Sequence, residues 1–367
     1  MSTEPLVIQP LRSEDVSRVL EFRQTYYPAA PEKGDAQQFD WQFAQHPLGS
    51  SLDAYLLAWQ GETLVGQLAT MRDRLLVDGA WHEVRWLCDL MVAPEERGGL
   101  AALRLFQAAM QRGELLLATG AGPAMEPLYR SLGWQQMQIA KTYYLPIRPR
   151  ALLRMAKATG REEESNLDLK SLVAAVAGGV LHRVLPGVVR KQQQHAAGVI
   201  CEKMGEINRD LDAFLAQIAP QLGITPWRAA ATYHWKLVAR PESNLQAWLA
   251  RDRGSSAIRG AMFARLVERP ELATWLEIVD YVALPEDRTA FMAMLCTAME
   301  AGLAQKVDFL RLRLSRPEHI KLLPSPWWRE HTLPVTDDVF AWSADTPLLE
   351  KLQHQPWHLT SLVSDRA

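Results

Sequence analysis

The sequence predicts an α/β fold made of two domains. Short apolar runs, typical of strands, alternate along the chain with longer stretches whose apolar residues recur at helical spacing. This order of runs occurs twice. The 367 residues also exceed one ordinary domain, because a domain is expected about every 150 residues. With 48% hydrophobic residues, each domain can bury a core of its own.

The first half begins with recognisable helix and turn signals. Ser13-Glu14-Asp15 offers a polar and acidic helix start. Gln60-Gly61-Glu62 separates two apolar runs as a hairpin turn does, and Asp78-Gly79 predicts a second turn. The elements expected before residue 86 are strands at 6–8, 54–59, 64–68 and 74–77, a helix from residue 13 and a helix near 39–43.

A turn between a strand and a helix is the most informative feature of the chain. The apolar run 86–92 leads through Pro94 into a charged turn. Gly98 and Gly99 lie in this turn, and a helical pattern of apolar residues starts at Leu100. Glycines let phosphates approach backbone N–H groups, and a helix N-terminus adds about half a positive charge. We therefore expect an anionic cofactor at this turn.

A second element follows at a fixed distance downstream. A short apolar strand at 115–118 precedes the stretch Leu128-Tyr129-Arg130-Ser131-Leu132-Gly133-Trp134. Together the two elements resemble the acetyl-coenzyme A (CoA) loop and the Leu-Tyr-x-x-Leu-Gly-Phe element of the GNAT (GCN5-related N-acetyltransferase) superfamily. The resemblance implies a mixed sheet with helices on both faces through about residue 147.

The chain departs from the family pattern at three positions. Glu96 stands where the family usually has Arg or Gln, Leu100 stands where it has Gly, and Gly122 stands where it often has Asn. The resemblance nevertheless implies acetyl-CoA as co-substrate and transfer of its acetyl group to a primary amine of a small molecule or sugar, with no metal. Amino acid, peptide, polyamine and hydroxyl acceptors stay open. The residues expected at the cofactor are Met91, Val92, Ala93, Glu96, Arg97, Gly98, Gly99, Leu100, Ala101 and Tyr129.

Two residues are the first candidates for catalysis. Tyr129 is the expected acid, because a phenol with a pKa near ~10 stays protonated at neutral pH and matches a departing thiolate. Packing of its ring on Trp134 is the alternative. Asp89 is the expected base or amine-binding carboxylate, because a carboxylate in an apolar strand is costly unless it is paired or functional. An ion pair with Arg85 or Arg72 is the alternative.

Glu83 is the second choice for the base. It shares a strand face with Asp89 if the strand is regular, since side chains alternate along a strand. Tyr26 and Tyr27 lie where the resemblance places the acceptor site, and ordinary surface aromatics are the alternative for both.

The second half predicts the same architecture again. Its elements are strands near 199–204, 245–250, 258–266, 274–282, 309–314 and 339–342, and helices near 210–219 and 287–304. The turn 284–290 contains no glycine, and Asp287 would repel a phosphate there. We therefore expect a GNAT-like domain that is degenerate. Tandem proteins with one active and one degenerate half are a known arrangement in the family.

These patterns divide the chain into three parts. The expected boundaries are 1–148 for a GNAT domain that binds acyl-CoA, 149–195 for a helical linker, and 196–367 for the degenerate domain. The apolar run 172–180 is broken by His182 and Arg183, well short of the ~20 residues that span a bilayer. A packed helical linker is favoured, and a helix at a membrane surface is the alternative.

Composition narrows the classes of function. A net charge of −2 and a pI near 6.5 provide no basic footprint for nucleic acid. Cys88, Cys201 and Cys296 lie far apart in apolar surroundings, which predicts reduced thiols and no metal site. The N-terminus has no basic and then apolar segment. We expect a cytoplasmic protein that is a monomer or a homodimer.

Two other functions stay open beside the acyltransferase. A non-catalytic CoA-binding or scaffold protein is suggested by Glu96, Leu100 and Gly122, where the family usually supplies ligand contacts. An aminoacyl-tRNA-dependent transferase of the tandem Fem type is disfavoured, because the chain has no basic helical arm.

Overall fold

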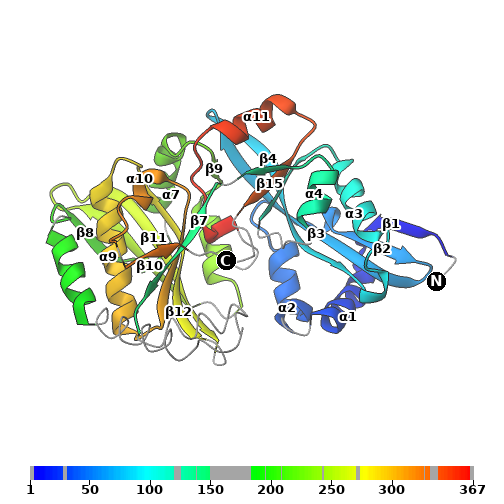
Figure 1. The fold of residues 1–367 in the computed structure, drawn as a ribbon, viewed down its shortest axis with the longest axis horizontal. Helices are drawn as coiled ribbons and strands as arrows, with labels where there is room; N and C mark the ends of the chain where they lie inside the picture. Colours follow the sequence, from blue (N-terminus) through cyan, green and yellow to red (C-terminus); the bar gives the residue numbers. More distant parts are fainter. Residues whose placement is uncertain are drawn as a thin grey trace, which may run out of the picture. The chain divides into compact units, whose positions relative to one another are not determined.

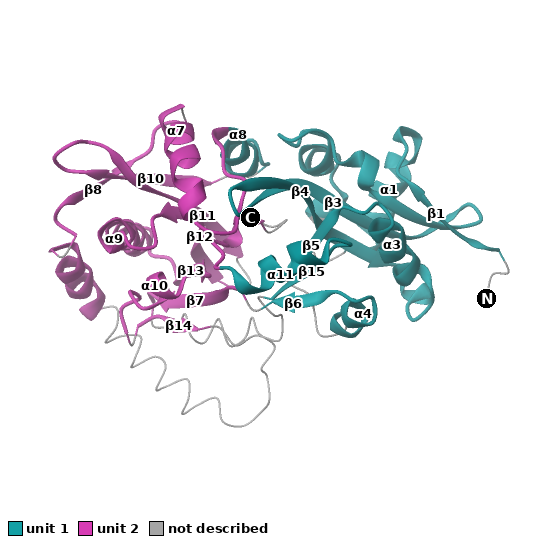
Figure 2. Cartoon of the chain, turned by 90° about the horizontal axis from the view of Figure 1, so that it is seen from above, with its two compact units in different colours: residues 1–138, 231–242, 335–355 teal, residues 139–230, 243–334, 356–367 magenta. Residues whose placement is uncertain are grey.

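The computed structural model describes residues 4–27, 31–119, 125–137, 139–148, 183–194, 196–207, 209–241, 244–269, 273–325, 327–330 and 338–363. The chain forms two compact units, and each unit gathers three separate segments of sequence (Figure 2). Unit 1 comprises residues 1–138, 231–242 and 335–355. Unit 2 comprises residues 139–230, 243–334 and 356–367.

Unit 1 is built on a mixed sheet. In spatial order its strands are β1 (Leu6–Pro10), β2 (Leu56–Gln60), β3 (Thr63–Val77), β4 (Ala80–Val92), β5 (Leu115–Thr119), β15 (Val339–Trp342) and β6 (Gln135–Met137). The pair β4–β5 is parallel, and the other neighbouring pairs in this order are antiparallel. The sequence predicted two strands at 64–68 and 74–77, which form one strand, β3, because polar residues interrupt its apolar pattern without ending it.

Helices cover both faces of this sheet (Figure 1). Along β2, Leu56 and Ala58 join the core cluster under α3, while Leu57 and Trp59 join the cluster under α1. This alternation is the period of two that a strand buried on both faces requires. The helical elements of unit 1 are η1 (Ser13–Asp15), α1 (Val16–Tyr26), η2 (Pro31–Gly34), α2 (Ala36–Phe39), η3 (Asp40–Ala44), η4 (Leu52–Ala54), η5 (Pro94–Glu96), α3 (Ala101–Met110), α4 (Glu126–Ser131), most of α8 (Ala230–Tyr233), η7 (His234–Val238) and α11 (Thr346–His354).

A pair of tryptophans ties the segment 231–242 into unit 1. The Trp41 and Trp235 rings stack with centroids 5.0 Å apart. The Trp41 indole N–H donates to the carbonyl of Trp235 (2.7 Å), and the Trp235 indole N–H donates to the carbonyl of Trp41 (2.8 Å). Each tryptophan lies in a π-helical turn, η3 or η7, so corresponding turns of the two sequence halves meet in one unit.

Unit 2 repeats the mixed sheet. In spatial order its strands are β14 (Arg329–Glu330), β7 (Lys141–Pro146), β13 (Phe309–Leu314), β12 (Ala273–Ala283), β11 (Ile258–Arg269), β10 (Leu245–Asp252) and β8 (Val199–Lys203). The remaining elements are α7 (Arg209–Ile218), η6 (Ala219–Gln221), β9 (Thr225–Pro226), α9 (Arg288–Ala304), α10 (Pro317–Ile320), η8 (Ser361–Val363) and a helix over 183–194.

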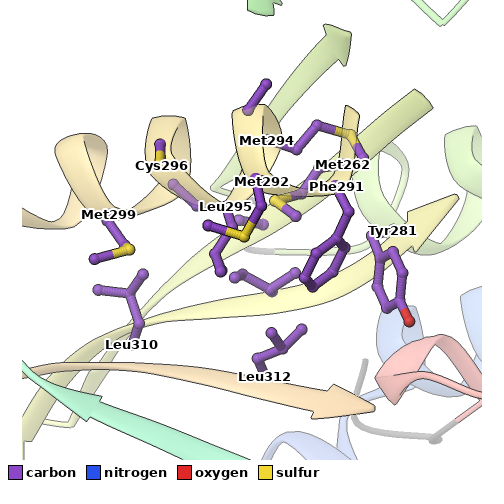
Figure 3. Packing of buried hydrophobic residues seen from close by; sticks show 14 of the residues in the cluster. Met262, Tyr281, Phe291, Met292, Met294, Leu295, Cys296, Met299, Leu310 and Leu312 are labelled. Carbon is purple, nitrogen blue, oxygen red and sulfur yellow. The ribbon is translucent and has the colours of Figure 1, made fainter. Parts of the chain in front are cut away.

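The helix α9 lies along one face of this sheet and is buried on almost every side (Figure 3). Met294, Leu295 and Cys296 are consecutive and all fully buried, as expected for a helix that is covered all round. Leu185 and Val189, from the helix over 183–194, belong to the same core.

The two sheets exchange their late strands. The strand β7, from the first half of the sequence, lies between β13 and β14 of unit 2. The strand β15, from the second half, lies between β5 and β6 of unit 1. The sequence predicted contiguous domains at 1–148 and 196–367, and the compact units cross these boundaries. An apolar strand that pairs with either sheet carries no local signal for which sheet it joins.

Part of the linker expectation lies outside the described residues, namely 149–182, including the apolar run proposed for a membrane surface. The described stretch 183–194 is helical. In the part of the chain that the structure describes, no helix combines the length and apolar character needed to cross a membrane.

Candidate active site

An irregularity in β4 shapes the centre of unit 1. Cys88 pairs with Ala69 and Met91 with Gln67, so Asp89 and Leu90 together oppose a single residue of β3. This is a β-bulge, and Asp89 takes the left-handed conformation with φ of 50°. The bulge shifts the alternation of side chains along the rest of the strand.

The shift places the carboxylate of Asp89 on the α1 side of the sheet. Leu87 and Leu90 both pack into the core under α3, although a regular strand would point them to opposite faces. Cys88 and Met91 pack into the clusters that contain α1 residues. Glu83 shares the face of Leu87 by regular alternation, so the expectation that Glu83 and Asp89 share a face is wrong.

Asp89 is fully buried and ion-paired. Its carboxylate accepts hydrogen bonds from Arg23 of α1 and from Lys33 of η2. Burial alone would raise the pKa of this carboxyl, but the two cations outweigh burial and hold the pKa below its ordinary value. Gln67 donates to the backbone carbonyl of Asp89 (3.2 Å), and the Tyr55 hydroxyl donates to Gln67 (2.7 Å).

The ion-pair partners predicted for Asp89 are wrong. Arg85 bonds to Glu114, and Arg72 bonds to Asp53 at 2.7 Å. Sequence reasoning missed Arg23, although a signal was present. Arg23 lies four residues after the buried Val19, on the apolar face of α1, and its side chain is only 1% exposed.

Glu83 is not brought to this cluster. Its carboxylate is exposed and pairs with Arg74 on the neighbouring strand, with 2.7 Å between Oε1 and Nε. Glu83 precedes Asp89 by six residue steps along the strand, which is about 20 Å at the usual rise per residue.

Beyond Trp86, β4 separates from β5. The parallel pairs are Val84–Leu115, Arg85–Leu116 and Trp86–Leu117. Beyond them, β5 continues by pairing with β15 alone. Among the described residues, the stretch 87–92 of β4 therefore has no strand neighbour on its β5 side, and its backbone groups on that edge are open to another partner.

The stretch 87–92 leads through Ala93 into the glycine turn and α3. Gly98 has φ of +86°, a conformation that side chains rarely adopt. A Cβ at Gly99 would lie 3.1 Å from the carbonyl oxygen of Glu96, which is closer than nine in ten real Cβ contacts. Both positions thus favour glycine because of the chain's own backbone.

The start of α3 has no side-chain cap. Leu100 occupies the N-cap position, makes no capping hydrogen bond and is 59% exposed. The first N–H groups of α3 therefore have no side-chain partner, and such groups bind anions. Arg97 is exposed in the same turn, and Ala101, the first residue of α3, is buried.

Tyr129 lies in α4 in an aromatic cluster. Its ring stacks on Phe340 (4.6 Å between centroids) and contacts Phe106 (5.4 Å) and Trp134 (5.0 Å). The packing on Trp134 that the sequence offered as an alternative is therefore present. Burial raises the pKa of Tyr129, so the phenol is protonated at neutral pH. Among the described residues the hydroxyl has no hydrogen-bond partner. Sequence reasoning missed Phe340, which the exchanged strand β15 brings in.

Tyr26 and Tyr27, at the end of α1, contact different elements: Tyr26 contacts η5, just before the glycine turn, and Tyr27 contacts η2. The Tyr26 hydroxyl donates to Glu95 of η5 (3.0 Å), and the ammonium of Lys33 lies 4.8 Å from the centre of the Tyr27 ring. Gly122 lies outside the described residues.

The corresponding turn of unit 2 is filled by its own side chains. Aligning Pro94 with Pro285 places Asp89 opposite Asp280 and Leu90 opposite Tyr281. At the start of α9, Asp287 accepts a hydrogen bond from the N–H of Ala290 (3.0 Å). Arg259 donates to both oxygens of the same carboxylate (2.8 and 2.6 Å). A carboxylate thus already occupies the anion position at this helix.

Comparison with known proteins gives a family for the first half. Residues 7–137 match the family described as acetyltransferase (GNAT) domain. A search of curated protein sequences finds no match.

Solved structures show that the fold extends over both units. A GCN5-related N-acetyltransferase from Anabaena variabilis is similar with a TM-score of 0.61 and 15% identity, covering 92% of this chain and 72% of that one. A protein from Enterococcus faecalis described as a probable N-acyltransferase has a TM-score of 0.59 and 13% identity, with coverages of 94% and 73%. A GCN5-related N-acetyltransferase from Kribbella flavida has a TM-score of 0.54 and 14% identity, with coverages of 94% and 72%. Residues 7–137 therefore match the acetyltransferase (GNAT) domain family, and the chain shares its fold with solved structures described as GCN5-related N-acetyltransferases.

Proposed function

We propose that unit 1 is an acetyl-CoA-dependent N-acetyltransferase that modifies a primary amine of a small molecule or sugar. One observation carries this proposal. The unpaired edge of β4, residues 87–92, runs directly into a glycine turn and an uncapped helix start. Acetyl-CoA has the matching order of groups, with amides along its pantetheine arm and a pyrophosphate beyond them.

The proposed cofactor contacts follow this order. Met91, Val92 and Ala93 offer backbone groups to the pantetheine amides. The backbone from 96 to 101, including Gly98, Gly99 and the exposed Leu100, surrounds the pyrophosphate. Arg97 adds a positive charge there. Glu96 adds a negative one, which opposes binding, so the backbone N–H groups of α3 supply most of the attraction in this proposal.

The reaction forms an amide and releases a thiol. The amine nitrogen attacks the thioester carbonyl, the carbon–sulfur bond breaks, and the thiolate takes a proton. We propose Tyr129 as the donor of that proton, since burial keeps its phenol protonated. Asp89 is proposed as the carboxylate that organises the acceptor side, because its lowered pKa makes it a weak base but a persistent negative charge. Solvent water then takes the proton of the amine.

Unit 2 is proposed to be catalytically silent. Asp287 and Arg259 occupy the helix start where unit 1 leaves N–H groups free. Among the described residues, none of Cys88, Cys201 and Cys296 forms a disulfide, as expected for the reducing, cytoplasmic location that we propose.

A scaffold function is the second candidate. Glu96 and the exposed Leu100 favour it, because neither suits a phosphate-binding turn. Catalytic turnover separates the two candidates.

The test is a screen of amine acceptors with acetyl-CoA and detection of free thiol. Tyr129→Phe keeps the aromatic packing and removes only the hydroxyl. We expect turnover to fall about 10²-fold or more, the usual range for losing a general acid, with acetyl-CoA affinity changed only a few-fold. Tyr143→Phe makes the same change in unit 2 and should leave turnover unchanged. Full activity of Tyr129→Phe would remove Tyr129 from the mechanism. If the natural chain releases no thiol with any of the acceptors, the scaffold function is favoured.

A further inference from the structure

The C-terminal segment 356–363 is buried in unit 2. Trp357, His358, Leu359 and Thr360 are each at most 4% exposed, and η8 after them is also buried. Three sets of contacts hold this segment in place.

One set of contacts joins the segment to β12. The His358 ring donates from Nε2 to the backbone carbonyl of Tyr281 (2.8 Å). Thr360 donates from its hydroxyl to the carboxylate of Asp280 (2.7 Å). The element η8 packs against the same strand, as Figure 3 shows beside Tyr281.

A second set of contacts joins the segment to the end of β13. The Ser315 hydroxyl, directly after β13, donates to the carbonyl of Trp357 (2.8 Å) and accepts from the N–H of Leu359 (2.8 Å). On a third side, Ile224 pairs with Trp357 as a parallel bridge, with hydrogen bonds of 2.9 and 2.8 Å.

The segment therefore lies where β12 and β13 separate. Their parallel pairing ends at Ile278–Leu312, just as β4 and β5 end at Trp86–Leu117. The carbonyl that His358 reaches belongs to Tyr281, which corresponds to Leu90 of unit 1. In the described residues no side chain bonds to the carbonyl of Leu90. The segment 356–363 therefore occupies the edge of β12, whereas the corresponding edge of β4 has no such partner among the described residues.

The buried charges of unit 2 are arranged around this segment. Arg228 donates to both oxygens of Asp280 (2.9 and 3.1 Å) and also to the carbonyl of His358 (3.4 Å). Thr360 completes the coordination of Asp280. The segment thus supplies hydrogen bonds that a buried ion pair requires.

Gly223 allows the segment to approach this closely. A Cβ at Gly223 would lie 2.4 Å from the carbonyl oxygen of Pro356, a distance that real Cβ atoms do not reach. Its φ of +69° also disfavours any side chain.

We propose that unit 2 is a peptide-binding module whose permanent ligand is the chain's own segment 356–363, held on the strand edge that unit 1 keeps open. The proposal does not depend on the activity of unit 1. It assigns the residues that bind the peptide as Ile224, Arg228, Asp280, Tyr281 and Ser315.

The first test is hydrogen exchange on the whole chain. Amides of 356–363 should exchange slowly, and saturating acetyl-CoA should not change their rates. Gly223→Ala should speed exchange at 356–363 at least tenfold while α9 keeps its protection. Gly205→Ala is the matched control, since a Cβ there meets no atom within 4 Å. Rapid exchange of 356–363 in the natural chain, or rates unchanged by Gly223→Ala, would overturn the proposal.

A second test applies even if Gly223→Ala fails to fold. A protease site inserted between Gln355 and Pro356 is cut after folding, so the segment is held by its contacts alone. The cut segment should stay bound through gel filtration and in millimolar acetyl-CoA. A synthetic peptide of residues 356–367 should exchange with it, and the same peptide carrying Thr360→Val should bind at least tenfold more weakly. Loss of the cut segment from a chain with unchanged circular dichroism, or its release by acetyl-CoA, would overturn the proposal.

Discussion

After Trp86, β4 of unit 1 has no strand neighbour on its β5 side among the described residues, whereas β12 of unit 2 is met after Ile278 by the C-terminal segment. The helix starts differ in the same sense. No side chain caps α3, and Asp287 caps α9. The two units share a fold, and what separates them is whether the chain's own groups satisfy the polar edge that the fold exposes. Fold alone therefore does not identify a binding site here.

The largest effect is expected from neutralising the buried carboxylate of either unit. Asp89→Asn leaves Arg23 and Lys33 without their counter-charge, and Asp280→Asn does the same to Arg228. Breaking a buried pair in this way costs about 3–5 kcal/mol of unfolding free energy, measurable by denaturant titration. When turnover is corrected for the fraction of folded protein, only Asp89→Asn should lower it. Equal losses of turnover in both variants would contradict the claim that only unit 1 is active.

Acidification sharpens this prediction. The pKa of Asp89 is lowered in the folded chain, so its ion pairs stabilise the fold fully above the pKa of the unfolded carboxyl, ~3.9. That stabilisation is lost as pH falls through the lower folded pKa. Carboxylates titrate between about pH 5 and about pH 2. When the pH is lowered across this range, the free energy of unfolding of Asp89→Asn should therefore fall less than that of the natural chain. Parallel losses would mean that Asp89 is not charged in the folded state.

A smaller effect is expected from giving α3 the cap that α9 has. Leu100→Asp places a carboxylate at the N-cap, where it should take the free N–H groups and repel a pyrophosphate. Acetyl-CoA affinity should fall about tenfold or more, which is ~1.4 kcal/mol, while the unfolding midpoint stays level or rises because Asp is a favoured cap. Leu100→Asn caps without charge and should lose less affinity. Equal affinity in Leu100→Asp would place the phosphates elsewhere.

The smallest effect is expected from the reverse change in unit 2. Asp287→Ala removes the cap of α9 and should cost about 1 kcal/mol of unfolding free energy. It should create no second acetyl-CoA site, because the segment 356–363 still covers the strand edge. A second binding event in calorimetry of this variant would show that Asp287 alone had blocked unit 2.

The sequence predicted much of this architecture because periodicity and turn signals are local. The strands around Gln60-Gly61-Glu62, the glycine turn before α3 and the position of Tyr129 all follow from adjacent residues. The turn without glycine before α9 was equally visible, with Asp287 in it.

Other features depend on contacts that no local pattern encodes. The bulge at Asp89 places its carboxylate on the opposite face of the sheet from Glu83. The prediction that they share a face assumed regular alternation and was therefore wrong. The exchange of β7 and β15 and the burial of 356–363 depend on which sheet an apolar strand meets. Phe340 reached Tyr129 only through that exchange.

The most direct test of the central claim is calorimetric titration of the whole chain with acetyl-CoA. We expect one binding site per chain, and we expect Leu100→Asp to weaken binding at that site about tenfold or more. Cutting the chain before Pro356 should leave the number of sites at one. Two equivalent sites in the natural chain, or one site whose affinity Leu100→Asp leaves unchanged, would contradict the central claim. That claim is that the strand edge and helix start of unit 1 bind acetyl-CoA, whereas those of unit 2 are occupied by the chain's own groups.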